Sequence, residues 1–284
     1  MKMLMQMEGN MHYNNSLYIS DLDGTLLNQF AELSEYTKKT LNSMIAKGLN
    51  FSIATARSLK PAQEMLSDVN LNIPIVLMNG VLIYDIKQER YLKINKITSS
   101  DSAAIVRTIR EYEVTAFMCE LNTREHKTYC ETFAQNPPND YVKKRIDSYC
   151  PDSRGFSNPS FENVIHFTII DTYERLQPIY EILSNQPDLN RTFFKNIYSP
   201  DWYLQICSAN ASKQTAVDLL RKKYKFEHIF GFGDNQNDLP LFAACDTRIA
   251  VENATPDIKD NADFICGTND SDGVAKWLEQ NANQ

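Results

Sequence analysis

The chain has 284 residues, of which 43% are hydrophobic and 23% are charged, and its formal net charge is -7. This length and composition predict a globular protein with one large domain or two modest ones. The acidic balance argues against a nucleic-acid binder, because phosphate backbones attract clustered lysine and arginine.

The N-terminal stretch 1–15 is rich in methionine but is interrupted by Glu8, Gly9 and Asn10. It lacks the apolar core of a signal peptide, and no run of 18 apolar residues occurs in the sequence. The cysteines are scattered, without the short Cys/His spacing of a zinc site. We therefore expect a cytoplasmic protein with reduced thiols, a loosely ordered N-terminal extension and no membrane partner. Its expected state is a monomer or a weak homo-oligomer.

Two acids follow the first apolar run of the chain. The run 17–19 predicts a buried strand, and Asp21 and Asp23 follow it two residues apart. In extended chain this spacing places both on one side, and Gly24 lets the backbone turn away. Two carboxylates so close repel each other, so we expect a cation beside them. Magnesium suits such an all-oxygen site best.

Two other interpretations of this stretch are a simple turn and a calcium-binding loop. A lone Asp-x-Asp is most often a simple turn after a strand. A calcium EF-hand loop counted from Asp21 would place Glu32 at its twelfth position. However, its sixth position, where the loop needs glycine, is Leu26, and a strand rather than a helix precedes it. We set the EF-hand aside.

Strands and helices alternate after the acidic turn. The expected elements are a helix 34–47 capped by Ser34, a strand 51–54, a helix 58–66 and a strand 75–78. This alternation predicts a parallel sheet with helical crossovers, in which ligands bind at the carboxyl ends of the strands. The residues that follow these strands are Asp21, Asp23, Thr55 and Asn79.

The pattern then becomes richer in strands. The expected elements are a hairpin at 81–85 and 90–95, helices 100–112 and 172–183, and strands 115–120, 164–170, 192–195 and 202–206. Pro178 must either kink the second helix or mark its first turn. Strand-rich sequence inserted into an α/β chain suggests a separate domain, which we place at 86–204.

The alternating pattern returns after this insertion. The expected elements are helices 212–223, 239–244 and 272–280, and strands 229–233 and 248–251. The expected fold is therefore α/β, with a Rossmann-like parallel sheet core formed by 1–85 and 205–284. The inserted α+β domain occupies 86–204.

Polar groups are expected to meet at one edge of the core sheet. They are Asp21, Asp23, Thr55 and Asp234 at strand ends, and Lys213, Asn237 and Asp238 at helix starts. Phosphoryl transfer uses such a set, namely a nucleophile, a cation and donors for the charge of the transition state. An aspartate nucleophile forms an acyl phosphate and divides one difficult displacement into two easier ones. Taken singly, Lys213 would be an ordinary surface lysine and Thr55 an ordinary helix cap.

Four short motifs in this order resemble those of the haloacid dehalogenase (HAD) superfamily, in particular the Cof-type phosphatases. The motifs are Asp21-Leu22-Asp23-Gly24-Thr25, Thr55, Lys213 and Gly233-Asp234-Asn235-Gln236-Asn237-Asp238. Asn253-Ala254 and the segment 272–275 also resemble the C-terminal part of that family. The similarity thus spans nearly the whole chain and implies an HAD-like core.

The resemblance implies a role for each residue of the site. Asp21 would be the nucleophile and a magnesium ligand, and Asp23 the general acid and base with its backbone carbonyl on the metal. Asp234 would be the other carboxylate on magnesium, and Asp238 would orient Lys213 or metal-bound water. The phosphate would be held by Thr55, Lys213 and Asn237, with backbone amides near Leu22 and Ala56.

The insertion resembles the family's α/β cap of the C2 type, which would cover the crevice and select the substrate. Many relatives carry glycine at the position of Ala56, and alanine narrows the backbone choices there. Within the insertion, His166 is expected to pack or to line the cap. Trp202 and Tyr203 are expected to line a substrate cavity or to join the core.

The function implied is a magnesium-dependent phosphatase that hydrolyses small phosphorylated metabolites, such as sugar phosphates, through an aspartyl phosphate. A sugar phosphomutase of the same superfamily stays an alternative, because it shares the nucleophile and the acid. It would transfer phosphate between substrate hydroxyls rather than to water. A phospho-accepting receiver domain is a second alternative, but an insertion of roughly 120 residues, a domain's worth of chain, would be unusual for it.

Overall fold

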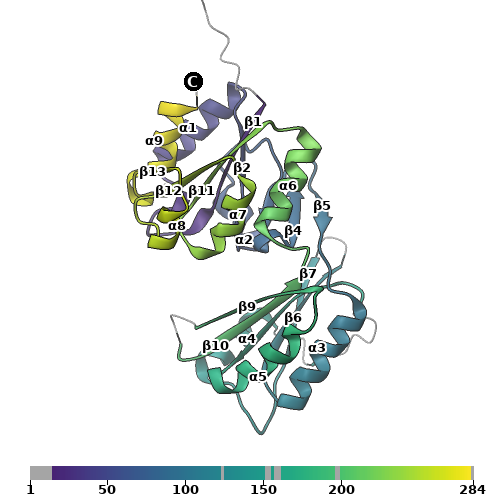
Figure 1. Ribbon diagram of the computed structural model, residues 1–284. Coiled ribbons are helices and arrows are strands. Elements are labelled where there is room, and N and C mark those ends of the chain that lie inside the picture. The colour runs from purple at the N-terminus through teal and green to yellow at the C-terminus, as the bar shows by residue number, and fades with distance from the viewer. Residues whose placement is uncertain (1–14, 123–124, 151–154, 157–160, 196–198, 283–284) are drawn as a thin grey trace, which may run out of the picture. The chain divides into compact units, whose positions relative to one another are not determined.

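The computed structural model describes residues 15–122, 125–150, 155–156, 161–195 and 199–282 (Figure 1). The stretch 1–14, where we expect a loosely ordered extension, lies outside these residues. The chain divides into two compact units: Met1–Leu92 with Ser212–Gln284, the core unit, and Lys93–Ala211, the inserted unit. The sequence places the inserted domain at 86–204. That these residues fold as an independent domain stays a prediction.

A parallel sheet forms the centre of the core unit. In the described residues its strands are, in spatial order, β13 (Phe264–Cys266), β12 (Thr247–Val251), β11 (His228–Gly233), β1 (Ser16–Ser20) and β2 (Asn50–Ile53). Every neighbouring pair is parallel. Beside β2, an isolated parallel bridge between Ala54 and Val76 brings in β3 (Ile75–Leu77), which pairs antiparallel with β4 (Leu82–Asp85), itself followed by β5 (Arg90–Ile94). The expected α/β class is confirmed.

Strand β1 is buried on both faces, as its continuous apolar run predicts. Leu17 and Ile19 join a cluster with side chains of the helices on one face. On the other face, the ring of Tyr18 stacks on Phe230 at a centroid distance of 4.6 Å, and Phe230 contacts Trp277. The strand therefore holds whatever follows Ser20 at a fixed place on the sheet edge.

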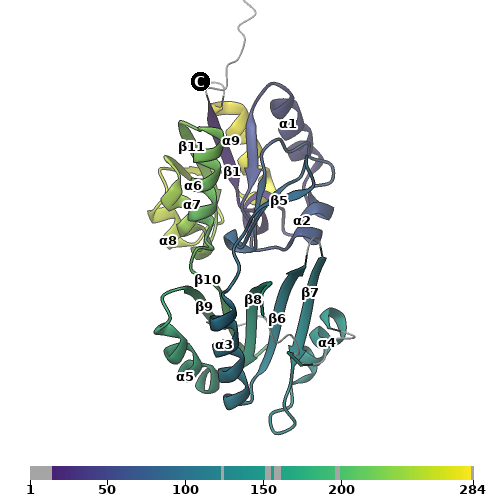
Figure 2. The same ribbon diagram turned by 90° about the vertical axis from the view of Figure 1, so that its right-hand side faces the viewer.

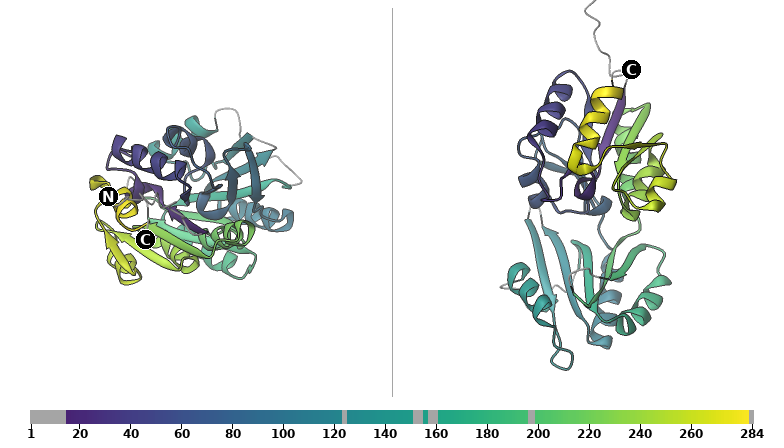
Figure 3. Two further views of the ribbon diagram at one scale, coloured as in Figure 1. Left: turned by 90° about the horizontal axis from the view of Figure 1, so that it is seen from above. Right: turned by 90° about the vertical axis from the view of Figure 1, so that its left-hand side faces the viewer.

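Helices cover both faces of this sheet (Figure 3). They are α6 (Lys213–Tyr224) and α7 (Leu239–Ala244) on one face, and α1 (Glu35–Ala46) and α9 (Gly273–Asn281) on the other. Two further helices, α2 (Leu59–Met65) and α8 (Pro256–Asp260), follow the ends of strands. Ser34 accepts a hydrogen bond from Thr37 N, and Ser212 accepts one from Thr215 N. Both side chains satisfy free amides at a helix start, which confirms the starts expected there.

The inserted unit is an antiparallel sheet between helices (Figure 2). In the described residues its strands are, in spatial order, β7 (Glu125–Glu131), β6 (Thr115–Asn122), β8 (Val164–Asp171), β10 (Trp202–Ser208) and β9 (Leu189–Lys195). The helices α3 (Ser99–Tyr112) and α5 (Tyr173–Ser184) cover one face, and α4 (Asp140–Tyr149) packs on the other. The expected α+β character of the insertion is confirmed.

The structure corrects several expectations for the inserted unit. Strand β7 and helix α4 occur where the sequence indicated no element. Pro178 lies inside α5, which begins at Tyr173, so its interpretation as a first-turn residue is wrong. Tyr203 is buried in the cluster under α4, and Trp202 packs against the opposite cluster, so of the two roles expected for them the core role is confirmed. None of the described helices is long and apolar enough to cross a membrane.

Candidate active site

Asp21 lies directly after β1, whose neighbours in the sheet are β11 and β2. Its backbone N donates to Phe232 O at 3.0 Å, which continues the pairing of β1 with β11 beyond the end of β1. The residue is 3% exposed. The sheet thus fixes a buried carboxylate at the carboxyl edge of its strands, as the sequence predicts.

Lys213 neutralises this carboxylate. It begins α6, and its Nζ donates to Asp21 Oδ1 at 2.6 Å and to Asp238 Oδ1 at 2.5 Å. Lys213 and Asp238 are 1% and 0% exposed. Buried charges are tolerated when they are paired and hydrogen-bonded, so these three side chains depend on one another.

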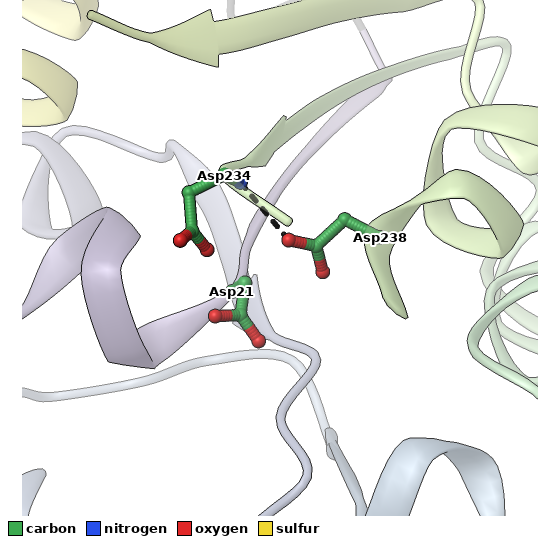
Figure 4. Close-up of side chains that lie close together, drawn as sticks. All are labelled: Asp21, Asp234 and Asp238. Atoms are coloured by element: carbon green, nitrogen blue, oxygen red, sulfur yellow. Dashed lines mark hydrogen bonds between the residues drawn. The ribbon is translucent and has the colours of Figure 1, made fainter. Parts of the chain in front are cut away.

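Asp238 connects this ion pair to the loop after β11. Its Oδ2 accepts a hydrogen bond from Asp234 N at 3.0 Å (Figure 4). It accepts another from Asn235 N at 3.3 Å. A Cβ on Gly233 would lie 2.7 Å from Asp238 Cβ, so glycine permits this approach. Both oxygens of Asp238 are occupied, which makes it a positioning group for Lys213 and for the backbone of Asp234.

Asp234 faces the turn that carries Asp23. Its Oδ1 accepts a hydrogen bond from Thr25 Oγ1 at 3.1 Å. Gly24 has φ +78°, and a Cβ there would lie 2.5 Å from Asp234 Oδ2. Two features therefore require glycine at position 24: the left-handed backbone of the turn, and the Asp234 carboxylate, which occupies the space that a Cβ would need.

The acidic residues fit a magnesium site. Oxygen atoms of Asp21, Asp234 and Asp238 lie within 4.8 Å of one another (Figure 4). Asp238 has no oxygen to spare, whereas Asp21 and Asp234 each keep Oδ2 without a hydrogen bond from the described residues. Carboxylate oxygens are the ligands that a hard divalent cation prefers. Asp21 and Asp234 would therefore hold it.

The electrostatics of the site also favour a cation. Burial raises the pKa of Asp21 to about 7, and the charge of Asp238 adds to the effect. Burial and Asp238 likewise raise the pKa of Asp234 to about 6. For Lys213 burial acts in the opposite sense, but the two carboxylates outweigh it and its pKa is raised. A cation beside Asp21 and Asp234 would favour their charged forms.

Asp23 differs from Asp21 in its surroundings. Its side chain is 49% exposed and is held by Arg57, whose Nε lies 2.7 Å from Asp23 Oδ2 and whose Nη2 lies 2.5 Å from Oδ1. The same short turn thus carries one buried carboxylate paired with a lysine and one accessible carboxylate paired with an arginine. This second pair is absent from our expectations.

The predicted phosphate-binding residues lie on separate strand and helix ends. Thr55 is buried; its N donates to Val76 O at 2.9 Å and its Oγ1 accepts from Arg57 N at 3.1 Å. Ala56 is exposed and does not have a positive φ, so this backbone does not require glycine. Asn237 is exposed on the turn after β11, and Leu22 is buried after Asp21. Their roles stay predictions.

Residues of the C-terminal motifs hold the turn that carries the acids and the start of α1. Asn253 Nδ2 donates to Gly24 O at 2.7 Å. Asp272 Oδ1 accepts from Thr37 Oγ1 at 2.9 Å and from Ser34 Oγ at the start of α1. The sequence pointed to these residues through the motifs that contain Asn253 and Asp272, but not to the contacts they make.

Comparison with known proteins identifies the family. Residues 18–278 match the family described as haloacid dehalogenase-like hydrolase. The chain belongs to the haloacid dehalogenase-like hydrolase family. The resemblance that rests on its four motifs is therefore confirmed.

The similarity to known proteins extends over nearly the whole chain. The 5-amino-6-(5-phospho-D-ribitylamino)uracil phosphatase YwtE of Bacillus subtilis is 26% identical, over 92% of this chain and 96% of its own. The pyridoxal phosphate phosphatase YbhA of Escherichia coli is 22% identical, over 91% and 95%. Among solved structures, TM0651 from Thermotoga maritima has a TM-score of 0.75 at 28% identity, covering 93% of this chain and 96% of its own. The fold is that of the HAD family.

Proposed function

We propose that this haloacid dehalogenase-like hydrolase is a magnesium-dependent phosphatase that hydrolyses small phosphate monoesters through a phosphoryl group carried on Asp21. The observation that carries the proposal is the buried Asp21 carboxylate, with Oδ1 on Lys213 and Oδ2 free, two residues before the accessible Asp23. Relatives named phosphatases that match over nine tenths of the chain support the class of phosphoric monoester hydrolases.

The reaction would proceed in two displacements at phosphorus. In the first, one carboxylate oxygen of Asp21 forms a bond to phosphorus, the bond to the ester oxygen breaks, and protonated Asp23 gives its proton to that oxygen. An alcohol leaves, and Asp23 is a carboxylate. In the second, water attacks phosphorus and loses a proton to Asp23 while the bond to Asp21 breaks. Inorganic phosphate leaves, and Asp21 and Asp23 return to their starting forms.

The remaining residues would bind and neutralise the phosphate. Lys213, Thr55 and Asn237, with backbone amides near Leu22 and Ala56, would hold its oxygens. Magnesium, held by Asp21, Asp234 and the backbone carbonyl of Asp23, would supply positive charge for the anionic substrate. Asp238 would keep Lys213 in place.

The substrate class we propose is small phosphorylated metabolites, such as sugar phosphates. YwtE and YbhA are named for chemically different esters, a ribityl phosphate and pyridoxal phosphate. Since all the proposed chemistry lies in the core unit, the choice of ester would lie with the inserted unit.

The test is phosphate release from a panel of sugar phosphates, nucleotides and cofactor phosphates, with magnesium and after chelation. We expect catalytic release from at least one ester, lost on chelation and restored by magnesium. Transfer of the phosphoryl group to a sugar hydroxyl in place of release would indicate a mutase. A single stable phosphorylation per chain without turnover would contradict the proposal.

A further inference from the structure

Arg57 holds both carboxylate oxygens of Asp23 in a two-point contact. Nε lies 2.7 Å from Oδ2, and Nη2 lies 2.5 Å from Oδ1. Such a fork fixes the direction of a carboxylate as well as its charge, which a single ammonium group does not do. The contact therefore determines where Asp23 points.

The backbone of Arg57 is itself held in place. Its N donates to Thr55 Oγ1 at 3.1 Å, and its O accepts from Met78 N at 3.0 Å. Thr55 is tied to β3 through Val76 O, at 2.9 Å from Thr55 N. The guanidinium thus extends from a backbone that is hydrogen-bonded to the residues after β2 and β3. This fixed backbone limits the positions that the guanidinium, and with it Asp23, can take.

Asp23 has little else to orient it. No hydrogen bond of its carboxylate to another described residue is seen, and the side chain is 49% exposed. Gly24, with φ +78°, turns the chain immediately after it. Asp21, by contrast, is buried against Lys213. Without Arg57 the Asp23 side chain would be free to sample other rotamers, whereas Asp21 would stay in place.

We propose that Arg57 is the positioning residue of Asp23, aiming its carboxyl group at the leaving oxygen in the first displacement and at water in the second. This inference rests on the proposed function. It assigns Arg57 to proton transfer rather than to phosphate binding. The guanidinium neither gains nor loses a proton, so the balance of the two displacements is unchanged.

The test compares two leaving groups. An alkyl phosphate needs a proton on its leaving oxygen, whereas p-nitrophenyl phosphate needs little protonation. Arg57→Met should lower the first-turnover release of alcohol from the alkyl ester, which reports phosphoenzyme formation, by roughly 10- to 100-fold, a part of the 100- to 10,000-fold that general acid–base catalysis contributes. The loss in first-turnover release of p-nitrophenol should be less than about a tenth of that, whereas hydrolysis of the phosphoenzyme should slow alike for both esters. Arg57→Lys, which keeps the charge but not the fork, should recover part of the rate.

A matched control is present in the same unit. Arg248 holds Asp263 by the same fork, with Nε 3.0 Å from Oδ2 and Nη2 2.7 Å from Oδ1, and neither belongs to the site. Arg248→Met should leave both rates unchanged. In an Asp23→Asn background, Arg57→Met should add little further loss, because the two act as one unit.

The outcomes separate the inference from the proposed function. Wild type without turnover of either ester would overturn the proposed function. Active wild type with equal losses for both esters in first-turnover release by Arg57→Met would overturn the positioning role. Inorganic phosphate is also tested as an inhibitor of wild type and Arg57→Met. If its inhibition constant for Arg57→Met rises by the same factor as the rate falls, Arg57 binds phosphate instead. Thermal unfolding of Arg57→Met close to that of wild type would exclude misfolding as the cause.

Discussion

Lys213 Nζ lies 2.6 Å from Asp21 Oδ1 at the carboxyl edge of the core sheet, and the side chains are 0% and 5% exposed. Removal of one partner from a buried ion pair typically lowers stability by about 3–5 kcal/mol, because the other charge stays buried and unpaired. We therefore expect Lys213→Met to lower the free energy of unfolding by that amount and to abolish turnover. Urea unfolding measures the first effect and phosphate release the second.

Lys38 supplies the control for this prediction. Its ammonium pairs with two exposed acids, Glu35 at 2.9 Å and Asp68 at 3.1 Å, on the surface of the same unit. Surface pairs contribute little, so Lys38→Met should change neither stability nor turnover appreciably. Equal behaviour of the two variants would contradict the role given to the buried lysine.

Magnesium should stabilise the folded chain through Asp21 and Asp234. A ligand that binds the folded state raises Tm with its concentration. We expect added magnesium to raise the Tm of wild type and to have no such effect on Asp234→Asn. Asp263→Asn, which removes an exposed acid from the same unit, should keep the full response. An undiminished magnesium response in Asp234→Asn would place the ion elsewhere.

Gly24→Ala should damage the site by two separable effects. A left-handed backbone is unfavourable for alanine by roughly 1–2 kcal/mol. In addition, the new Cβ would lie 2.5 Å from Asp234 Oδ2. Gly155 has φ +73° with no described atom within 4 Å of its Cβ position, so Gly155→Ala measures the backbone effect alone. We expect Gly24→Ala to lose more stability than Gly155→Ala and to require more magnesium for half-maximal activity. Equal losses of stability in the two variants, with the magnesium dependence of Gly24→Ala unchanged, would refute the close approach of position 24 to Asp234.

His166 should make the inserted unit sensitive to acid. Burial lowers its pKa from 6.5 to about 4, so between these values the unfolded chain binds more protons than the folded one. Stability is therefore full above pH 6.5 and falls as the pH decreases toward 4, by at most about 3.4 kcal/mol at 1.36 kcal/mol per pKa unit. His166→Gln should flatten this part of the curve. Trp202 fluorescence in a Trp277→Phe background would follow the inserted unit, and an identical slope for both proteins would exclude His166 as the cause.

The sequence predicted the residues of the site better than their contacts. Asp21, Thr55 and Asp234 could be placed together because each follows a strand, and parallel strands end at one edge of a sheet. The two-point contact between Arg57 and Asp23 could not be predicted, because it depends on the direction in which Gly24 turns the chain. That direction is a property of φ, and glycine permits several.

In the inserted unit the misses have local causes. Strand β7 reads Glu-His-Lys-Thr-Tyr-Cys-Glu, a polar run without clear alternation, and it lies at the edge of its sheet. Helix α4 follows two prolines that indicated a loop, although its start carries a helix signal: Asn139 accepts a hydrogen bond from Val142 N at 3.0 Å. Helix α5 keeps Pro178 in its interior because Leu176, Ile179 and Leu183 bury its apolar face against the sheet. Tertiary packing outweighs local preference there.

The central claim, that Asp21 carries the phosphoryl group and Asp23 moves the protons, is tested most directly by trapping. Wild type, Asp21→Asn and Asp23→Asn are mixed with an aryl phosphate, quenched, digested and examined by mass spectrometry for the phosphorylated residue. We predict phosphate on Asp21 in wild type, its slowly hydrolysed accumulation on Asp21 in Asp23→Asn, and no phosphoenzyme in Asp21→Asn. Phosphate on Asp23 in the Asp21→Asn chain, or rapid turnover by either variant, would contradict the account.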